Sequence, residues 1–185
     1  NNKVNNGLAK SIINGVSKIL SKYENVVILE DDCVPFKSFF SFISDQLETN
    51  YFKMNCGAIC TYMFPEISER NSNKLYSMPL KYFIPWGWAT NRENWKIFIK
   101  NKKKNLISYE KETLYSKILK KINKKNIWSI DFIYHNLKLR KNFIYPNFSL
   151  VKNIGFDASG VNSKVDNSLR VVGNNKKNIK FLKKT

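Results

Sequence analysis

Apolar residues recur at helical spacing in several parts of the chain. Leu8, Ile12, Val16 and Leu20 are four residues apart, so they line one face of an amphipathic helix predicted over residues 7–20. The same periodicity predicts helices over residues 37–52, 91–101, 113–122 and 129–139. The residues expected to pack from the helix over 37–52 are Phe39, Phe40, Ile43 and Leu47.

Two runs with few polar positions predict buried strands instead. The sequences NVVILE (25–30) and GAICTYM (57–63) are typical of strands covered on both faces, as in a parallel sheet, and residues 142–155 also look extended. Because strands and helices alternate along the chain, the pattern predicts an α/β layer architecture. Residues 64–73 form a polar loop, and residues 74–90, with two prolines and a glycine, are expected to be irregular and to line a site.

The length and composition predict a single domain with a large positive charge. A chain of 185 residues with 43% hydrophobic residues can bury a core, so we expect one domain over residues 1–185 that ends in a basic tail over 171–185. The net charge of +18 fits a nucleic-acid surface, an anionic membrane or a pocket for anionic substrates. A bias of the whole sequence toward Lys and Asn explains the charge equally well.

The cysteines indicate a reducing, cytoplasmic environment. Cys33, Cys56 and Cys60 are too few and too unevenly spaced for a disulfide framework, and the single histidine, His135, argues against a zinc site. No apolar stretch approaches the length of a membrane span. Because the sequence opens on Asn1, without a starting Met or a signal peptide, we expect it to begin inside a longer protein.

Three consecutive carboxylates, Glu30, Asp31 and Asp32, end the first apolar run. Acids at the carboxyl end of a strand lie where open α/β sheets bind ligands, and their oxygens suit the hard cations Mg²⁺ and Mn²⁺. The alternative is an ordinary strand end whose acids are neutralised by lysines and by the N-terminus of the following helix. The residues alone favour neither interpretation.

Three further features have the chemistry of a site, each with a structural alternative. In IPWGWAT (84–90), Trp86 and Trp88 flank Gly87, which suits a sugar ring or a base, although the tryptophans could equally fill the core. Asp131 opens the helix over 129–139 and could cap it or act as a general base, capping being the more common role. The sequence NIGFDASGVNS (153–163) is consistent with a loop that closes over an anionic ligand.

The order of these features resembles a family of bacterial sugar transferases. The chain has, in this order, a strand that ends in the acids of ILEDDCVP, the segment PWGWAT, an Asp-bearing helix and the segment YPNFSLVKNIGFD. This order is similar to that of enzymes of surface polysaccharide and lipooligosaccharide assembly, which have the GT-A fold. It is more distantly similar to the N-acetylglucosaminyltransferase I group. The resemblance covers about residues 7–162. It implies a Rossmann-like α/β domain that uses Mn²⁺ or Mg²⁺ to transfer a sugar from a nucleotide-diphosphate donor to a saccharide or lipid-linked saccharide acceptor, with inversion.

The resemblance also implies roles for individual residues. Asp32 would be the metal ligand, and Asp131 would take the proton from the acceptor hydroxyl. The residues that would bind the donor or close over it are Glu30, Asp31, Gly87, Trp88, Gly160, Val161 and Asn162. A lipid-linked acceptor would bring the basic protein into peripheral contact with an anionic membrane, at its cytoplasmic face.

Two departures from the family pattern keep other interpretations open. Relatives often have the Asp directly after the Trp, whereas Ser129 and Ile130 stand between Trp128 and Asp131. The strand and helix that open a GT-A domain have no counterpart here, so the expected domain lacks its N-terminal segment and an inactive or truncated remnant is the main alternative. A nucleic-acid-binding protein is a lesser one, because the chain has no RNA-recognition or zinc-finger motif, and no nucleic-acid partner is expected.

Overall fold

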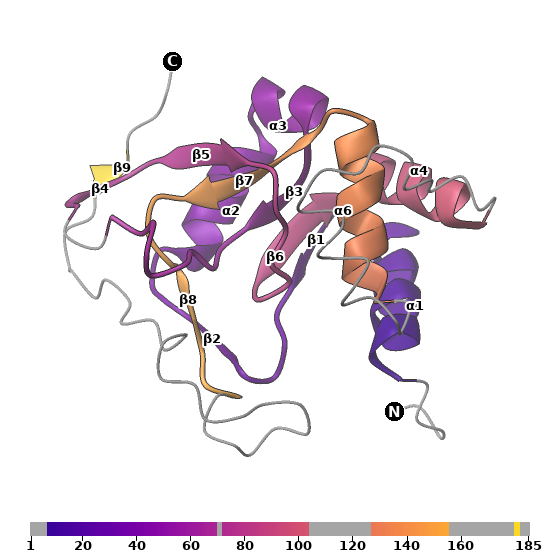
Figure 1. The fold of residues 1–185 in the computed structure, drawn as a ribbon, viewed down its shortest axis with the longest axis horizontal. Coiled ribbons are helices and arrows are strands. Elements are labelled where there is room, and N and C mark those ends of the chain that lie inside the picture. Colours follow the sequence, from indigo (N-terminus) through magenta and orange to yellow (C-terminus); the bar gives the residue numbers. More distant parts are fainter. Residues whose placement is uncertain (1–6, 70–71, 104–126, 156–179, 182–185) are drawn as a thin grey trace.

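The structure, a computed structural model, describes residues 7–69, 72–103, 127–155 and 180–181. Within these ranges the protein is a mixed α/β fold, with helices on both faces of a central sheet (Figure 1). The five strands of the sheet, in spatial order, are β1 (Asn25–Ile28), β6 (Trp88–Asn91), β3 (Cys56–Cys60), β7 (Asn142–Pro146) and β5 (Ser77–Leu80). The β3–β7 pair is parallel and the other three pairs are antiparallel, so the sheet is mixed.

Two short sheets join segments that are distant in sequence. β2 (Cys33–Pro35) pairs antiparallel with β8 (Val151–Asn153). β4 (Lys74–Leu75) pairs in parallel with β9 (Lys180–Phe181), so two residues of the predicted basic tail form a strand, while the rest of that tail lies outside the described residues. Residues 74–90 contain β4, β5 and β6, and the prediction of an irregular segment is therefore wrong for much of its length.

The helices follow the predicted periodicity with one break. α1 (Leu8–Leu20), α4 (Arg92–Lys103) and α6 (Trp128–Lys138) confirm three predictions. The single helix expected over 37–52 is instead two helices, α2 (Phe39–Leu47) and α3 (Asn50–Asn55). The helix predicted over 113–122 lies outside the described residues.

Two hydrophobic cores lie on opposite faces of the sheet. Cys56 and Ile59 of β3 belong to the core under α2 and α3, whereas Ala58 and Cys60 belong to the core under α1, α4 and α6. Ala58, Ile59 and Cys60 alternate between the two faces, and an irregularity in the pairing between Cys56 and Ala58 puts those two residues on opposite faces. β3 is therefore buried at every position, which confirms the prediction of a buried strand there.

β1 differs from its prediction. It lies at one end of the described sheet and pairs antiparallel with β6, and the side chain of Val27 is 37% exposed. The prediction of a fully buried, parallel strand over 25–30 is therefore wrong. Its pairing places Ile28 opposite Trp88, so the end of β1 and the PWGW segment lie side by side.

Candidate metal-binding site at the acidic turn

The three consecutive carboxylates lie in a tight turn between β1 and β2. The backbone N–H of Cys33 donates to the carbonyl of Glu30 at 3.0 Å, which closes a four-residue turn with Asp31 and Asp32 at its corner. The acids therefore follow the strand instead of belonging to it. This geometry keeps Glu30 and Asp32 close together in space.

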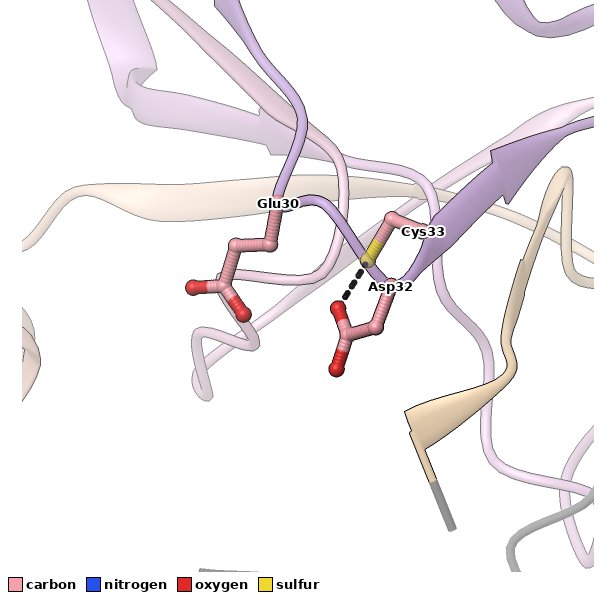
Figure 2. Close-up of side chains that lie close together, drawn as sticks. All are labelled: Glu30, Asp32 and Cys33. Carbon is pink, nitrogen blue, oxygen red and sulfur yellow. Dashed lines mark hydrogen bonds between the residues drawn. The ribbon is translucent and has the colours of Figure 1, made fainter. Parts of the chain in front are cut away.

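Glu30, Asp32 and Cys33 form a compact group of potential ligands. One ligand atom from each residue lies within 4.8 Å of the other two, and the Cys33 thiol donates to Oδ1 of Asp32 at 3.5 Å. Figure 2 shows both carboxylates on the same side of the turn. Asp31 is exposed and is not a member of the group. The sequence analysis did not include Cys33 among the site residues. Its position directly after the three acids was the signal that could have identified it as a member of the group.

Burial and like charge shape the chemistry of this group. Burial, followed by the charges of Asp32 and Asp31, raises the pKa of Glu30 to about 7. Burial, followed by the charges of Asp32 and Glu30, raises the pKa of Cys33 to about 12, so the thiol keeps its proton at neutral pH. Two carboxylates suit Mg²⁺ or Mn²⁺, whereas a protonated thiol is a poor ligand for either ion. The donor set therefore fits a hard divalent cation held by Glu30 and Asp32.

Asp32 packs against Gly155, which follows β8. The backbone N–H of Ile154 donates to the carbonyl of Asp32 at 2.8 Å, and Cys33 pairs with Asn153. A Cβ at position 155 would clash with Oδ2 of Asp32 and lie 3.2 Å from its Cβ. Glycine is therefore required if the carboxylate is to keep this position. The fold brings residues 153–155 beside the acidic turn, a contact that the sequence did not predict.

Gly87 packs behind the same turn. Its φ of +69° favours glycine, and a Cβ there would lie 2.6 Å from Oγ1 of Thr61 and 3.4 Å from Cδ2 of Leu29, the residue before Glu30. The Thr61 hydroxyl donates to the carbonyl of Gly87 at 2.6 Å. The PWGW segment thus packs against Leu29, the residue that directly precedes the acidic turn.

The two tryptophans beside Gly87 lie in different cores. Trp86 is half-buried and packs against the core that contains Cys33, with its ring centroid 4.6 Å from that of Tyr62. Trp88 is fully buried in the opposite core and stacks on Trp128 at 5.5 Å. The Trp88 ring therefore fills the core, which was the alternative considered from the sequence. Trp86, which was not among the predicted donor-binding residues, is the tryptophan on the side of the acidic turn.

Asp131 lies in the first turn of α6, in the layer of α1 and α4. The N-cap of α6 is Ile127, so the capping interpretation of Asp131 is wrong. Its carboxylate forms an ion pair with Lys102 of α4, and it is not a member of the group formed by Glu30, Asp32 and Cys33. Its role as a general base stays a prediction. The predicted loop residues Gly160, Val161 and Asn162 lie outside the described residues.

Comparison with known proteins gives no family for this chain. No protein-family model matches the sequence, and no curated protein matches it either. Among the described helices, none combines the length and apolar character needed to cross a membrane. The class defined by the fold and the site is therefore a mixed α/β protein with a candidate divalent-cation site beside its sheet.

Proposed function

We propose that the protein is a metal-dependent glycosyltransferase of the GT-A type, which moves a sugar from a nucleotide-diphosphate donor to a saccharide or lipid-linked saccharide acceptor in cell-surface glycan synthesis. The observation that carries the proposal is the pair of carboxylates, Glu30 and Asp32, held within 4.8 Å with the pKa of Glu30 raised to about 7. Repelling acids of this kind are relieved by a divalent cation. The type of reaction is inferred from the resemblance of the segments ILEDDCVP and PWGWAT to the bacterial sugar transferases.

The residues around the turn have complementary roles in this proposal. Asp32, with Glu30 beside it, would hold Mn²⁺ or Mg²⁺, which would neutralise the charge that develops on the diphosphate leaving group. Gly155 leaves room for the Asp32 carboxylate. Asp31 would face the donor from its exposed position, and Trp86 offers an aromatic surface for a sugar ring or a base.

Asp131 would act on the acceptor. A carboxylate within hydrogen-bond reach of the acceptor hydroxyl takes its proton as the hydroxyl attacks, and one such displacement inverts the anomeric centre. Because the Asp131 carboxylate is paired with Lys102, the acceptor must reach an oxygen that Lys102 leaves accessible. The free thiols of Cys33, Cys56 and Cys60 support a reducing, cytoplasmic location for this reaction.

A donor-hydrolysis assay combined with metal titration tests the proposal. Nucleotide release from a panel of nucleotide sugars is expected with Mn²⁺ and is expected to stop with EDTA. Asp32→Asn should lower both Mn²⁺ affinity and nucleotide release by about a hundredfold, because it removes a charged ligand. Asp45→Asn is the matched control, since Asp45 is an exposed acid of α2 outside the group.

Two outcomes separate the parts of this proposal. If Mn²⁺ binds through Asp32 but no donor is hydrolysed, the metal site stands and the protein is a folded remnant without transferase activity. If Asp32→Asn keeps full Mn²⁺ affinity and full activity, the acidic turn is not the metal site.

A further inference from the structure

Within the residues that the structure describes, most of the positive charge lies on one layer. The layer of α1, α4 and α6, with the residues that directly follow α1 and α6 (8–24, 92–103 and 128–141), contains eleven Lys and Arg residues and three acidic residues. The remaining described residues up to Gly155 contain five basic and seven acidic residues. A bias of the whole sequence toward Lys would affect both parts alike. The uneven distribution therefore marks a distinct surface.

We use the name α1/α4 face for the part of this layer that carries five exposed lysines of α1, of the residues directly after it, and of α4. They are Lys10, Lys18, Lys22, Lys96 and Lys100, and all five are exposed. Lys96 and Lys100 are one turn apart on the side of α4 away from its buried residues Trp95 and Phe98.

α1 and α4 are joined directly, so their lysines belong to one surface. The indole N–H of Trp95 donates to the hydroxyl of Ser17 at 2.9 Å. Arg92 donates to the carbonyl of Leu20 at 2.8 Å and forms an ion pair with Glu24 at 2.6 Å. Figure 1 shows the two helices on the same side of the sheet.

The charge of the α1/α4 face is not neutralised within the described part of the chain. The ion pairs found there use Arg92, Lys102 and Lys53, and none uses a lysine of the face. Glu93 is the exposed acid on the outer side of α4, against five lysines. Such a surface attracts an extended anionic partner.

α1 and the residues directly after it also expose apolar and aromatic side chains, and these indicate the class of partner. Leu8 and Ile19 of α1 are 64% and 43% exposed, and Tyr23, directly after the helix, is 61% exposed. Aliphatic and tyrosine side chains beside lysines suit the boundary between lipid headgroups and acyl chains. Arginine is the preferred residue for bidentate recognition of nucleic acid, whereas the α1/α4 face is made of lysines, and Arg92 beside it is already held by Glu24.

We propose that the α1/α4 face docks the protein on a membrane that contains anionic lipids. The ammonium groups lie along the negatively charged headgroups while Leu8, Ile19 and Tyr23 enter the interface. Binding of this kind is screened by salt, because the attraction decays over about 8 Å at physiological ionic strength. The docking surface does not depend on sugar transfer, and it orients the protein whatever reaction it performs.

Vesicle co-sedimentation tests this surface. The full chain is expected to bind phosphatidylcholine vesicles that contain phosphatidylglycerol, to bind pure phosphatidylcholine poorly, and to be released as salt is raised. A variant with Lys10, Lys18, Lys96 and Lys100 all changed to Gln should bind at least about tenfold more weakly, because several headgroup attractions are lost together. The matched control changes Lys37, Lys53, Lys74 and Lys152 to Gln, which removes the same charge from exposed positions elsewhere. Circular dichroism verifies that both variants are folded.

Three outcomes would overturn the proposal. Equal weakening in both variants would mean that net charge alone, and not this face, drives binding. Vesicle binding that is indifferent to phosphatidylglycerol would exclude an anionic-lipid surface. Tighter binding to mixed DNA or RNA fragments than to vesicles, lost in the α1/α4 variant and kept in the control, would assign the face to nucleic acid.

Discussion

Glu30 is a described acid whose environment differs clearly from that of an exposed carboxylate. It shares a turn with Asp31 and Asp32, and burial and their charges raise its pKa to about 7. The sequence placed the three acids side by side, but could not tell which pair would converge. The turn decides this, because it directs Asp31 into solvent and leaves Glu30 and Asp32 facing the same side.

The raised pKa of Glu30 predicts a specific pH dependence of stability. The unfolded carboxyl titrates near 4.5 and the folded one near 7, so the folded state binds more protons between these values. Stability from this group is therefore full below pH 4.5 and falls as pH rises to 7, by about 1 kcal/mol once solvent screening of a partly exposed group is allowed for. Urea unfolding at pH 5 and pH 7.5 in EDTA measures this difference.

Glu30→Gln is the control for this measurement. It cannot ionise, so its stability should change less between the two pH values than that of the parent protein. Added Mn²⁺ should raise the stability of the parent more at pH 7.5 than at pH 5, because protons compete with the cation for the carboxylate. Identical pH slopes for parent and variant would show that Glu30 titrates normally.

At the scale of elements, Thr49 decides where one predicted helix becomes two. Its hydroxyl accepts a hydrogen bond from the backbone N–H of Phe52 at 3.1 Å and donates to the carbonyl of Gln46 at 2.8 Å. It therefore caps the start of α3 just after α2 has ended. The change of direction buries Phe42 and Phe52, while Phe40, which was expected to pack, is 60% exposed.

Removing this cap should destabilise the protein modestly. Thr49→Ala loses both hydrogen bonds and is expected to lower the free energy of unfolding by about 1 kcal/mol. Thr49→Ser keeps the hydroxyl and should stay within a few tenths of a kcal/mol of the parent. Chemical denaturation of the three proteins gives the comparison, and equal losses in both variants would show that the methyl group, not the cap, matters.

The strands show why apolar runs are an incomplete guide. β1 and β3 both come from apolar runs, yet β1 lies at an end of the described sheet and β3 in its middle. Periodicity cannot distinguish these positions, because strand order depends on long-range pairing. β5 was missed because of Pro79, which is tolerated since β5 lies at the other end of the described sheet and one face of its backbone needs no partner strand.

At the scale of the whole molecule, the sheet divides the aromatic residues between two cores. Trp88, Trp95 and Trp128 pack on the side of α1, α4 and α6, whereas Trp86 lies on the other side with Tyr62. The two tryptophans of the PWGW segment therefore have different surroundings. One supports the packing of three helices, and the other lies on the side of the acidic turn.

Substitution of each tryptophan should separate these roles. Trp88→Ala is expected to lower the free energy of unfolding by about 3–5 kcal/mol, because the ring is fully buried. Trp86→Ala should lower it by about half as much or less, since its side chain is only partly buried. Tryptophan fluorescence during denaturation measures both.

The milder change Trp88→Phe keeps this comparison possible if Trp88→Ala does not fold. It should still be less stable than Trp86→Phe. Equal losses at the two positions would contradict the assignment of the tryptophans to different cores.

The sequence alone determined the features that arise from local chemistry. Helical periodicity identified α1, α4 and α6, the apolar run identified β3, and the acids were recognised as a candidate cation site, because each depends on neighbours within a few turns of chain. Tertiary structure decided which groups meet. It placed Gly155 against Asp32, Trp86 rather than Trp88 on the side of the turn, Asp131 against Lys102, and the lysines of α1 and α4 on one face. These outcomes depend on strand order and register, which are set by the burial of surfaces that are far apart in the chain.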